Sequence, residues 1–157
     1  MSLSVPQLPA ISGTTFKVGI AAACYNERLV GALLEQTVTL LKKQGVKAKA
    51  IEVVRVPGSN ELPVAVKLLG KKQKPDVLIA LGVIIRGDTI HYELISEAAT
   101  NGLMHVALDL NIPVINGIVV AEKQSQAVER CTGKINRGAE FAFAALHMAN
   151  LKKQLSK

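Results

Sequence analysis

The most constraining feature of this chain is the apolar run Val77–Ile85, which contains no polar side chain. A parallel strand that helices cover on both faces is apolar along its whole length. The run stops at residues 86–89, Arg-Gly-Asp-Thr. Glycine permits positive φ there, and Asp or Thr can cap a following helix. The run therefore predicts a central parallel strand that leads through a tight turn into a helix.

The rest of the chain alternates between strand and helix patterns. The other expected strands are Lys17–Cys24, Ala48–Val56 and Val114–Val120. The expected helices cover Glu27–Gln44, Ser59 or Asn60 to Lys72, Thr89–Asn111, Ser125–Arg130 and Gly138–Gln154, with Asn26 as the cap of the first. This alternation predicts an α/β fold, a three-layer αβα sandwich with a four-stranded parallel sheet and helices on both faces. Glu52 and Arg55 make the second strand more polar, which places it nearer an edge.

Length and composition predict one domain over residues 1–157, of which 1–16 form an extended N-terminal arm with enough strand formers to add a strand to a sheet. The formal net charge of +7 admits anionic partners, but aromatic residues make up only 3% of the chain. Platforms for stacking single strands are therefore scarce, and we expect no nucleic-acid partner. No apolar run is long enough for a membrane helix. The two cysteines have no disulfide or metal spacing, so a reduced, cytoplasmic protein is expected.

Polar residues follow each of the first three expected strands. Open α/β sheets bind ligands at the edge where their strands end. Tyr25 offers a flat ring there, and Glu61 a carboxylate that can accept hydrogen bonds. The turn after residue 86 offers amides, a hydroxyl and the imidazole of His91. Two ordinary interpretations stay open, because a first-turn Glu commonly complements a helix dipole and an isolated His is commonly a surface residue.

Two further residues do not fit this crevice. Asn116 lies near the start of the fourth strand, on the order of 10 Å from its carboxyl end at ~3.3 Å per residue. Arg130 lies on a later helix. A second subunit that completes the site would explain both positions. No dinucleotide or P-loop motif is present, so those nucleotides are not expected ligands.

Over about residues 16–154 the chain resembles the 6,7-dimethyl-8-ribityllumazine synthase family. The resemblance rests on several motifs in family order and spacing. They are Ala23-Cys24-Tyr25-Asn26, Val56–Pro63 (VPGSNELP), Ala80–Glu93 (ALGVIIRGDTIHYE), Gln126–Arg130 (QAVER) and Asn136-Arg137-Gly138.

The resemblance implies a site between adjacent subunits and a role for each matching residue. One group would bind the pyrimidine ring and ribityl chain of 5-amino-6-(D-ribitylamino)uracil. It comprises Tyr25, Ser59, Asn60, Glu61, Val83, Ile84, Ile85 and, from the neighbouring subunit, Asn116. Asp88 and Thr89, with the neighbour's Arg130, would bind the phosphate of 3,4-dihydroxy-2-butanone 4-phosphate. His91 would transfer the protons, and no metal or redox cofactor would be required.

The same resemblance implies a homopentamer or a shell of sixty subunits, with riboflavin synthase as a candidate partner. The loop 131–137 is shorter than is usual in the family, which favours the shell. Asn60 and Asn116 stand where family members commonly have aromatic residues. This departure motivates an alternative function, a flavin- or lumazine-binding homologue without useful turnover.

Overall fold

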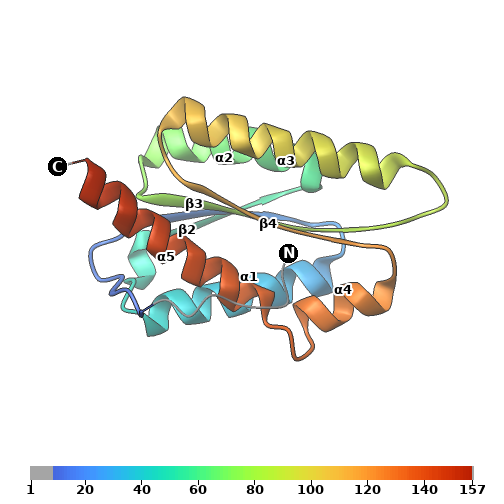
Figure 1. Ribbon diagram of the computed structural model, residues 1–157, viewed down its shortest axis with the longest axis horizontal. Helices are drawn as coiled ribbons and strands as arrows, with labels where there is room; N and C mark the ends of the chain where they lie inside the picture. The colour runs from blue at the N-terminus through green and yellow to red at the C-terminus, as the bar shows by residue number, and fades with distance from the viewer. Residues whose placement is uncertain (1–8, 157) are drawn as a thin grey trace.

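The computed structural model describes residues 9–156 and contains the predicted four-stranded parallel sheet (Figure 1). Its strands are β1 (Val18–Ala23), β2 (Ile51–Val56), β3 (Val77–Ile85) and β4 (Val114–Ala121), in the order β2-β1-β3-β4. The prediction that the second strand lies at an edge is confirmed. β4 forms the other edge, so β1 and β3 lie in the centre.

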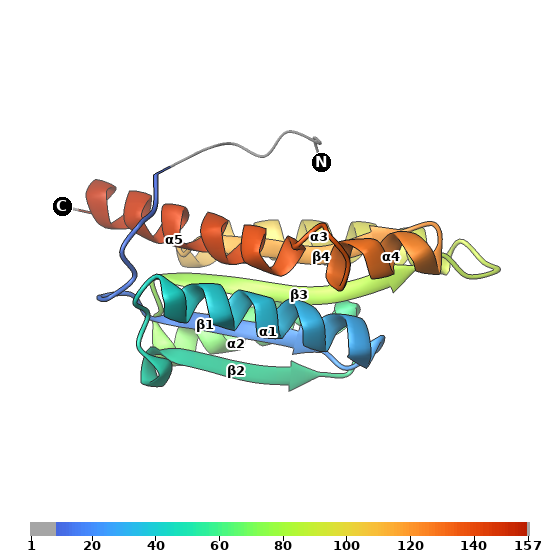
Figure 2. The same cartoon turned by 90° about the horizontal axis from the view of Figure 1, so that it is seen from below.

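Helices cover both faces of the sheet, which confirms the three layers (Figures 1 and 2). The α-helices are α1 (Glu27–Lys43), α2 (Leu62–Gln73), α3 (His91–Leu110), α4 (Gln124–Cys131) and α5 (Arg137–Leu155). Two single-turn 3₁₀ helices, Ala48–Ala50 and Ser59–Glu61, precede β2 and α2. Helices α2 and α3 lie on one face, and α1, α4 and α5 lie on the other. None of the helices within residues 9–156 has the length and apolarity of a membrane span.

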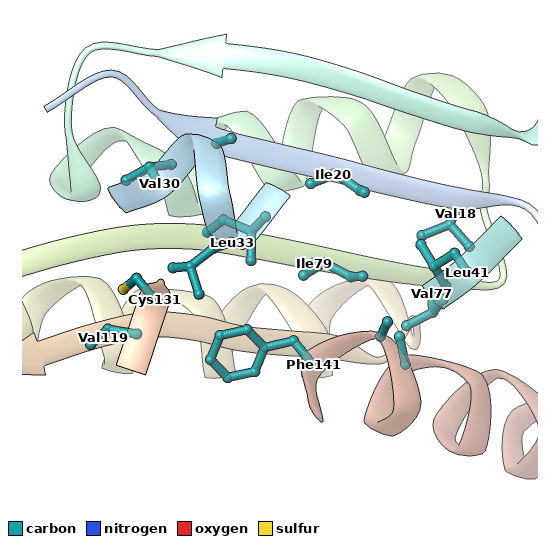
Figure 3. Packing of buried hydrophobic residues seen from close by; sticks show 14 of the residues in the cluster. Val18, Ile20, Val30, Leu33, Leu41, Val77, Ile79, Val119, Cys131 and Phe141 are labelled. Atoms are coloured by element: carbon teal, nitrogen blue, oxygen red, sulfur yellow. The ribbon is translucent and has the colours of Figure 1, made fainter. Parts of the chain in front are cut away.

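The central strand β3 is buried on both faces, as its uninterrupted apolar run predicts. Val77 and Ile79 pack into the larger core beneath α1, α4 and α5 (Figure 3), while Leu78 and Ala80 pack beneath α2 and α3. Alternate side chains of a strand point to opposite faces, so both cores depend on this one segment. Because it is held from both sides, β3 is a rigid base for the loop that follows it.

Two local predictions are wrong. Residues Ala48–Ala50 form a 3₁₀ turn, since pairing with β1 begins only at Ile51, opposite Val18, and the earlier residues have no strand partner there. Asn26 does not cap α1 with its side chain. Its backbone is left-handed (φ 56°, ψ 42°), a conformation Asn tolerates, and its Nδ2 donates to the Val83 carbonyl at 2.9 Å. Asn26 thus ties the end of β1 to β3.

The expected N-terminal arm strand is not confirmed. Residues 1–8 lie outside the described part of the chain, and residues 9–16 contain no strand. Instead, the Gly13 amide donates to the Gln44 carbonyl at 2.7 Å and Phe16 is buried in the larger core. Lys153 lies over the Phe16 ring, 5.8 Å from its centroid. The described end of the arm is therefore anchored to its own domain.

Burial makes one thiol a probe of folding. Cys131 lies in the larger core, where desolvation raises the pKa of its thiol from 9.0 to about 11. Because the thiolate is the nucleophile, iodoacetamide at pH 8 should not alkylate Cys131 in the folded protein. A Cys24→Ser variant leaves Cys131 as the single thiol, and mass spectrometry should find label only after denaturant is added. Equal labelling rates with and without denaturant would contradict this.

Candidate active site

Tyr25, Gly58 and Glu61 meet where β1 and β2 end. The Tyr25 amide donates to the Pro57 carbonyl at 3.0 Å, which joins the two turns. A methyl group at Gly58 would lie 3.2 Å from Cδ2 of Tyr25 and 3.1 Å from Oε2 of Glu61. Glycine thus lets the ring and the carboxylate approach each other. The Gly58 amide also donates to Oε2 of Glu61 at 2.8 Å and fixes that carboxylate. Tyr25 remains 74% exposed, which is unusual for a residue with so large an aromatic side chain.

The next turn packs directly on β3. Ser59 is buried, and a methyl group at Gly82 would lie only 2.5 Å from its Oγ. The 3₁₀ turn can therefore sit against β3 only because residue 82 has no side chain. Its neighbours Asn60 and Glu61 are exposed on the outer side of the turn. This contact holds the predicted ribityl-binding segment against the end of the central strand.

Strand β3 extends beyond β1 at this edge. Its pairing with β1 stops at Leu81, whereas its pairing with β4 continues to Ile85. The Leu78 amide donates to the carbonyl of Pro113, just before β4, and the Arg86 amide donates to that of Ala121 at its end. The alternate residues Val83 and Ile85 therefore direct their backbone groups toward the side of β1. Asn26 uses the Val83 carbonyl. By the same alternation Ile84 faces β4, so of the three predicted backbone contacts Val83 and Ile85 are the better placed.

The loop after β3 carries the predicted proton-transfer and anion-binding residues. It extends past the end of the sheet (Figures 1 and 2), and Asp88, Thr89 and His91 are exposed on it. Oγ1 of Thr89 accepts the amide of His91 at 3.4 Å. His91 is the first residue of α3. Its imidazole is therefore presented at a helix start, where the helix dipole favours an anion.

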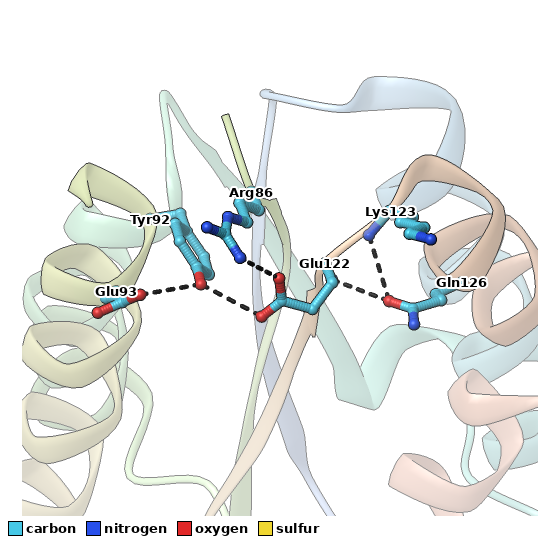
Figure 4. A network of polar contacts seen from close by, with 6 residues as sticks. All are labelled: Arg86, Tyr92, Glu93, Glu122, Lys123 and Gln126. Carbon is cyan, nitrogen blue, oxygen red and sulfur yellow. Dashed lines mark hydrogen bonds and ion pairs between the residues drawn. The ribbon is translucent and has the colours of Figure 1, made fainter. Parts of the chain in front are cut away.

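Sequence reasoning missed a polar network at the end of β4 (Figure 4). Glu122 accepts Arg86 Nη1 at 2.9 Å on Oε2, and the Tyr92 hydroxyl lies 3.2 Å from its Oε1. The hydrogen bond from Arg86, with the one from Tyr92 and the positive charge, lowers the pKa of Glu122. The hydrogen bond to Glu93 and desolvation raise the pKa of Tyr92. The missed signal was a pair of opposite charges directly after two neighbouring strands.

Asn116 and Arg130 are not brought to this edge within the described chain. Asn116 lies on the outer side of the edge strand β4, where its Nδ2 donates to Thr100 Oγ1 at 3.2 Å and its Oδ1 accepts the Ile118 amide at 3.1 Å. Arg130, near the end of α4, donates to the Gln126 carbonyl at 2.9 Å. These contacts join neither residue to the Tyr25 and Glu61 pair. Their role toward a second chain stays a prediction.

A parallel sheet with an exposed ring, a fixed carboxylate and an exposed imidazole at its carboxyl edge places this chain in one class of protein. It is an α/β protein of the kind that binds small molecules where the strands end.

Comparison with known proteins identifies the family within that class. The family model described as 6,7-dimethyl-8-ribityllumazine synthase matches residues 15–153. Among relatives with that name, the one from Nitrosospira multiformis is 40% identical over 95% of this chain and 91% of its own length. Those from Prochlorococcus marinus subsp. pastoris and Thermococcus kodakarensis are each 38% identical, over 92% and 91% of this chain and 94% and 90% of their own lengths. The chain belongs to the 6,7-dimethyl-8-ribityllumazine synthase family, transferases of riboflavin biosynthesis.

Proposed function

We propose that this chain, as one lumazine synthase domain, condenses 5-amino-6-(D-ribitylamino)uracil with 3,4-dihydroxy-2-butanone 4-phosphate. The 5-amino group and the ketone form an imine with loss of water. Elimination of phosphate leaves an enol, which tautomerises to a new carbonyl, and the ribitylamino nitrogen attacks that carbonyl with loss of a second water. Holding two substrates in one crevice supplies much of the rate of such a reaction. Family membership over residues 15–153 supports the reaction as a whole.

The observation that carries the pyrimidine site is the pairing of an exposed ring with a fixed carboxylate. Tyr25 is 74% exposed beside Glu61, whose Oε2 already accepts the Gly58 amide. A flat ring suits stacking on a planar pyrimidine. The second oxygen of Glu61 then accepts a ribityl hydroxyl, next to Ser59 and Asn60. Backbone groups of Val83 and Ile85, with Ile84 between them, recognise the ring edge.

The exposed loop supports the remaining roles. His91 moves the protons in the imine, elimination and closure steps, which suits an imidazole near neutral pH. Asp88 and Thr89 hold the phosphate through their turn, together with Arg130 of the neighbouring subunit. Asn116 of that subunit closes the pyrimidine pocket with an amide. The reaction balances without a metal or redox cofactor.

The deciding experiment follows both products at once. The purified protein is mixed with the two substrates while lumazine absorbance and inorganic phosphate are recorded. We expect equal amounts of the two to appear. The alternative, a lumazine- or flavin-binding homologue, would bind the pyrimidine and release no phosphate. That result would overturn the proposed activity.

The shared site requires an assembly, and we propose a homopentamer or a shell of sixty chains. Two features support it. Both edge strands of the sheet lack a further strand in the described chain, and the outer edge of β2 borders an apolar groove lined by Val54, Val56 and Leu68. Helices α2 and α3 also expose Val64, Met104 and Leu108. Riboflavin synthase is a candidate enzyme partner of such a shell, and the cytoplasm is its expected compartment.

Light scattering checks the assembly. We expect a particle of five or sixty times the 16.7 kDa chain mass, and the short loop between α4 and α5 favours sixty. A monomeric mass would remove the shared site, because Asn116 and Arg130 would then have no second chain to serve.

A further inference from the structure

The loop that carries His91 is bounded by two residues that contact the same carboxylate. Arg86 precedes the loop and Tyr92 follows it. Oε2 of Glu122 accepts Arg86 Nη1 at 2.9 Å, and Oε1 lies 3.2 Å from the Tyr92 hydroxyl (Figure 4). The Arg86 guanidinium also lies over the Tyr92 ring, 5.8 Å from its centroid. We propose that Glu122 is a positioning residue of the reaction, which holds both ends of loop 87–91 and so fixes His91.

Glu122 can hold the loop because its own main chain is fixed. Glu122 directly follows β4, and the Arg86 amide donates to Ala121 at 2.9 Å, one step beyond the last paired residues of the two strands. Oε1 of Gln126 accepts the amides of Glu122 at 2.9 Å and Lys123 at 3.2 Å. Glu122 is thereby fixed between the end of β4 and the first turn of α4.

The same glutamine connects this network to the predicted phosphate-binding side chain. The Gln126 carbonyl accepts Arg130 Nη1 at 2.9 Å, while the Gln126 side chain holds the Glu122 amide. A continuous set of contacts thus runs from Arg130 through Gln126 and Glu122 to Tyr92, beside His91. In the proposed assembly, His91 serves the active site at this chain's own sheet, whereas Arg130 serves the site of a neighbouring subunit. Glu122 therefore lies between two active sites.

Of the two contacts to Glu122, the one from Arg86 is the stronger anchor. It joins full opposite charges, whereas Tyr92 has one proton to share. The Tyr92 hydroxyl lies 3.0 Å from Oε1 of Glu93 as well, so it donates to one carboxylate at a time. Since the Arg86 and Glu122 side chains are 57% and 53% exposed, this pair contributes little to global stability. Its effect is local, on the geometry of the loop.

The test is Glu122→Gln, which keeps the shape and removes the charge. We expect kcat to fall by roughly 10- to 100-fold, the order of loss that a small misplacement of a catalytic group causes. Hydrogen exchange of amides 87–91 should become faster, with the melting temperature unchanged. Glu35→Gln, the same change at an exposed position of α1, is the matched control and should leave kcat and exchange at wild-type values.

A second variant separates the contacts. Tyr92→Phe removes one of them and should lower kcat less than Glu122→Gln does. The double variant should be no worse than Glu122→Gln alone, because both changes act through one carboxylate. Additive losses, or wild-type kcat or wild-type exchange in Glu122→Gln, would overturn the proposal. If Glu122→Gln melts earlier, wild-type kcat in Tyr92→Phe would also overturn it.

This inference rests on the proposed function, and the two can fail separately. An inactive wild-type protein would overturn the proposed function, while hydrogen exchange of amides 87–91 would still test whether Glu122 holds the loop. The other outcome is an active wild-type protein, an inactive His91→Ala variant and a fully active Glu122→Gln variant. It would leave the proposed function intact and overturn only the positioning role of Glu122.

Discussion

Turnover of His91→Ala should fall by roughly 10²- to 10⁴-fold, the usual contribution of a positioned general acid–base group. His91 is exposed at the first residue of α3, at the end of a loop that extends past the sheet. Its removal leaves no gap in either core, so folding and assembly should persist. The measurement is the single-turnover rate of lumazine formation, with enzyme in excess over the pyrimidine and the butanone phosphate saturating, which separates chemistry from binding and product release.

The matched control is His105→Ala. His105 is exposed on the same helix, away from the carboxyl edge, and its loss should leave turnover unchanged. Wild-type turnover in His91→Ala would remove His91 from the mechanism and assign proton transfer to the departing phosphate or to water.

Arg130→Ala should raise KM for the butanone phosphate by roughly 10- to 100-fold, as expected when a charged hydrogen bond of about 1.5–3 kcal/mol is lost. KM for the pyrimidine should change little, because only the other substrate carries a phosphate. The Arg130 side chain donates to the Gln126 carbonyl of its own helix, so its removal should cost the fold little. Arg130→Lys should also be impaired, since a bidentate fork becomes a point charge.

Steady-state kinetics with each substrate varied in turn measures this split. Lys43→Ala removes a cation from the last turn of α1, at the opposite edge of the sheet, and should leave both KM values unchanged. An equal rise of both KM values in Arg130→Ala would indicate a structural role.

Regular patterns predicted the elements of the fold well. The uninterrupted apolar run of β3 gave its bounds to the residue, because burial on both faces leaves no room for a polar side chain. The assignment of residues 48–50 to a strand is wrong, since where a strand begins depends on where its partner begins. The side chain of Asn26 was misassigned for a similar reason. Its partner, the Val83 carbonyl, is 57 residues away and follows no local period.

The candidate site likewise contains residues that the sequence predicts and a contact that it does not. The sequence predicts Tyr25, Glu61 and His91 as site residues because each lies in the turn after a strand, and parallel strands end at one edge. Glu122 also follows a strand, but its importance depends on the pairing of Ile85 with Ala121, which brings Arg86 beside it. Sequence patterns locate elements, whereas such contacts need the strand order and register as well.

The unequal lengths of β1 and β3 have a consequence for how this protein tolerates mutation. Where β3 runs on past Leu81, the hydrogen-bonding groups of Val83 and Ile85 belong to the main chain. Every residue type except proline supplies the same amide and carbonyl. Substitution at these positions therefore changes the side chains that line the crevice, while the main-chain donors and acceptors remain. If Val83 and Ile85 recognise the pyrimidine as proposed, side-chain departures such as Asn60 and Asn116 can accumulate around them without removing the main-chain groups.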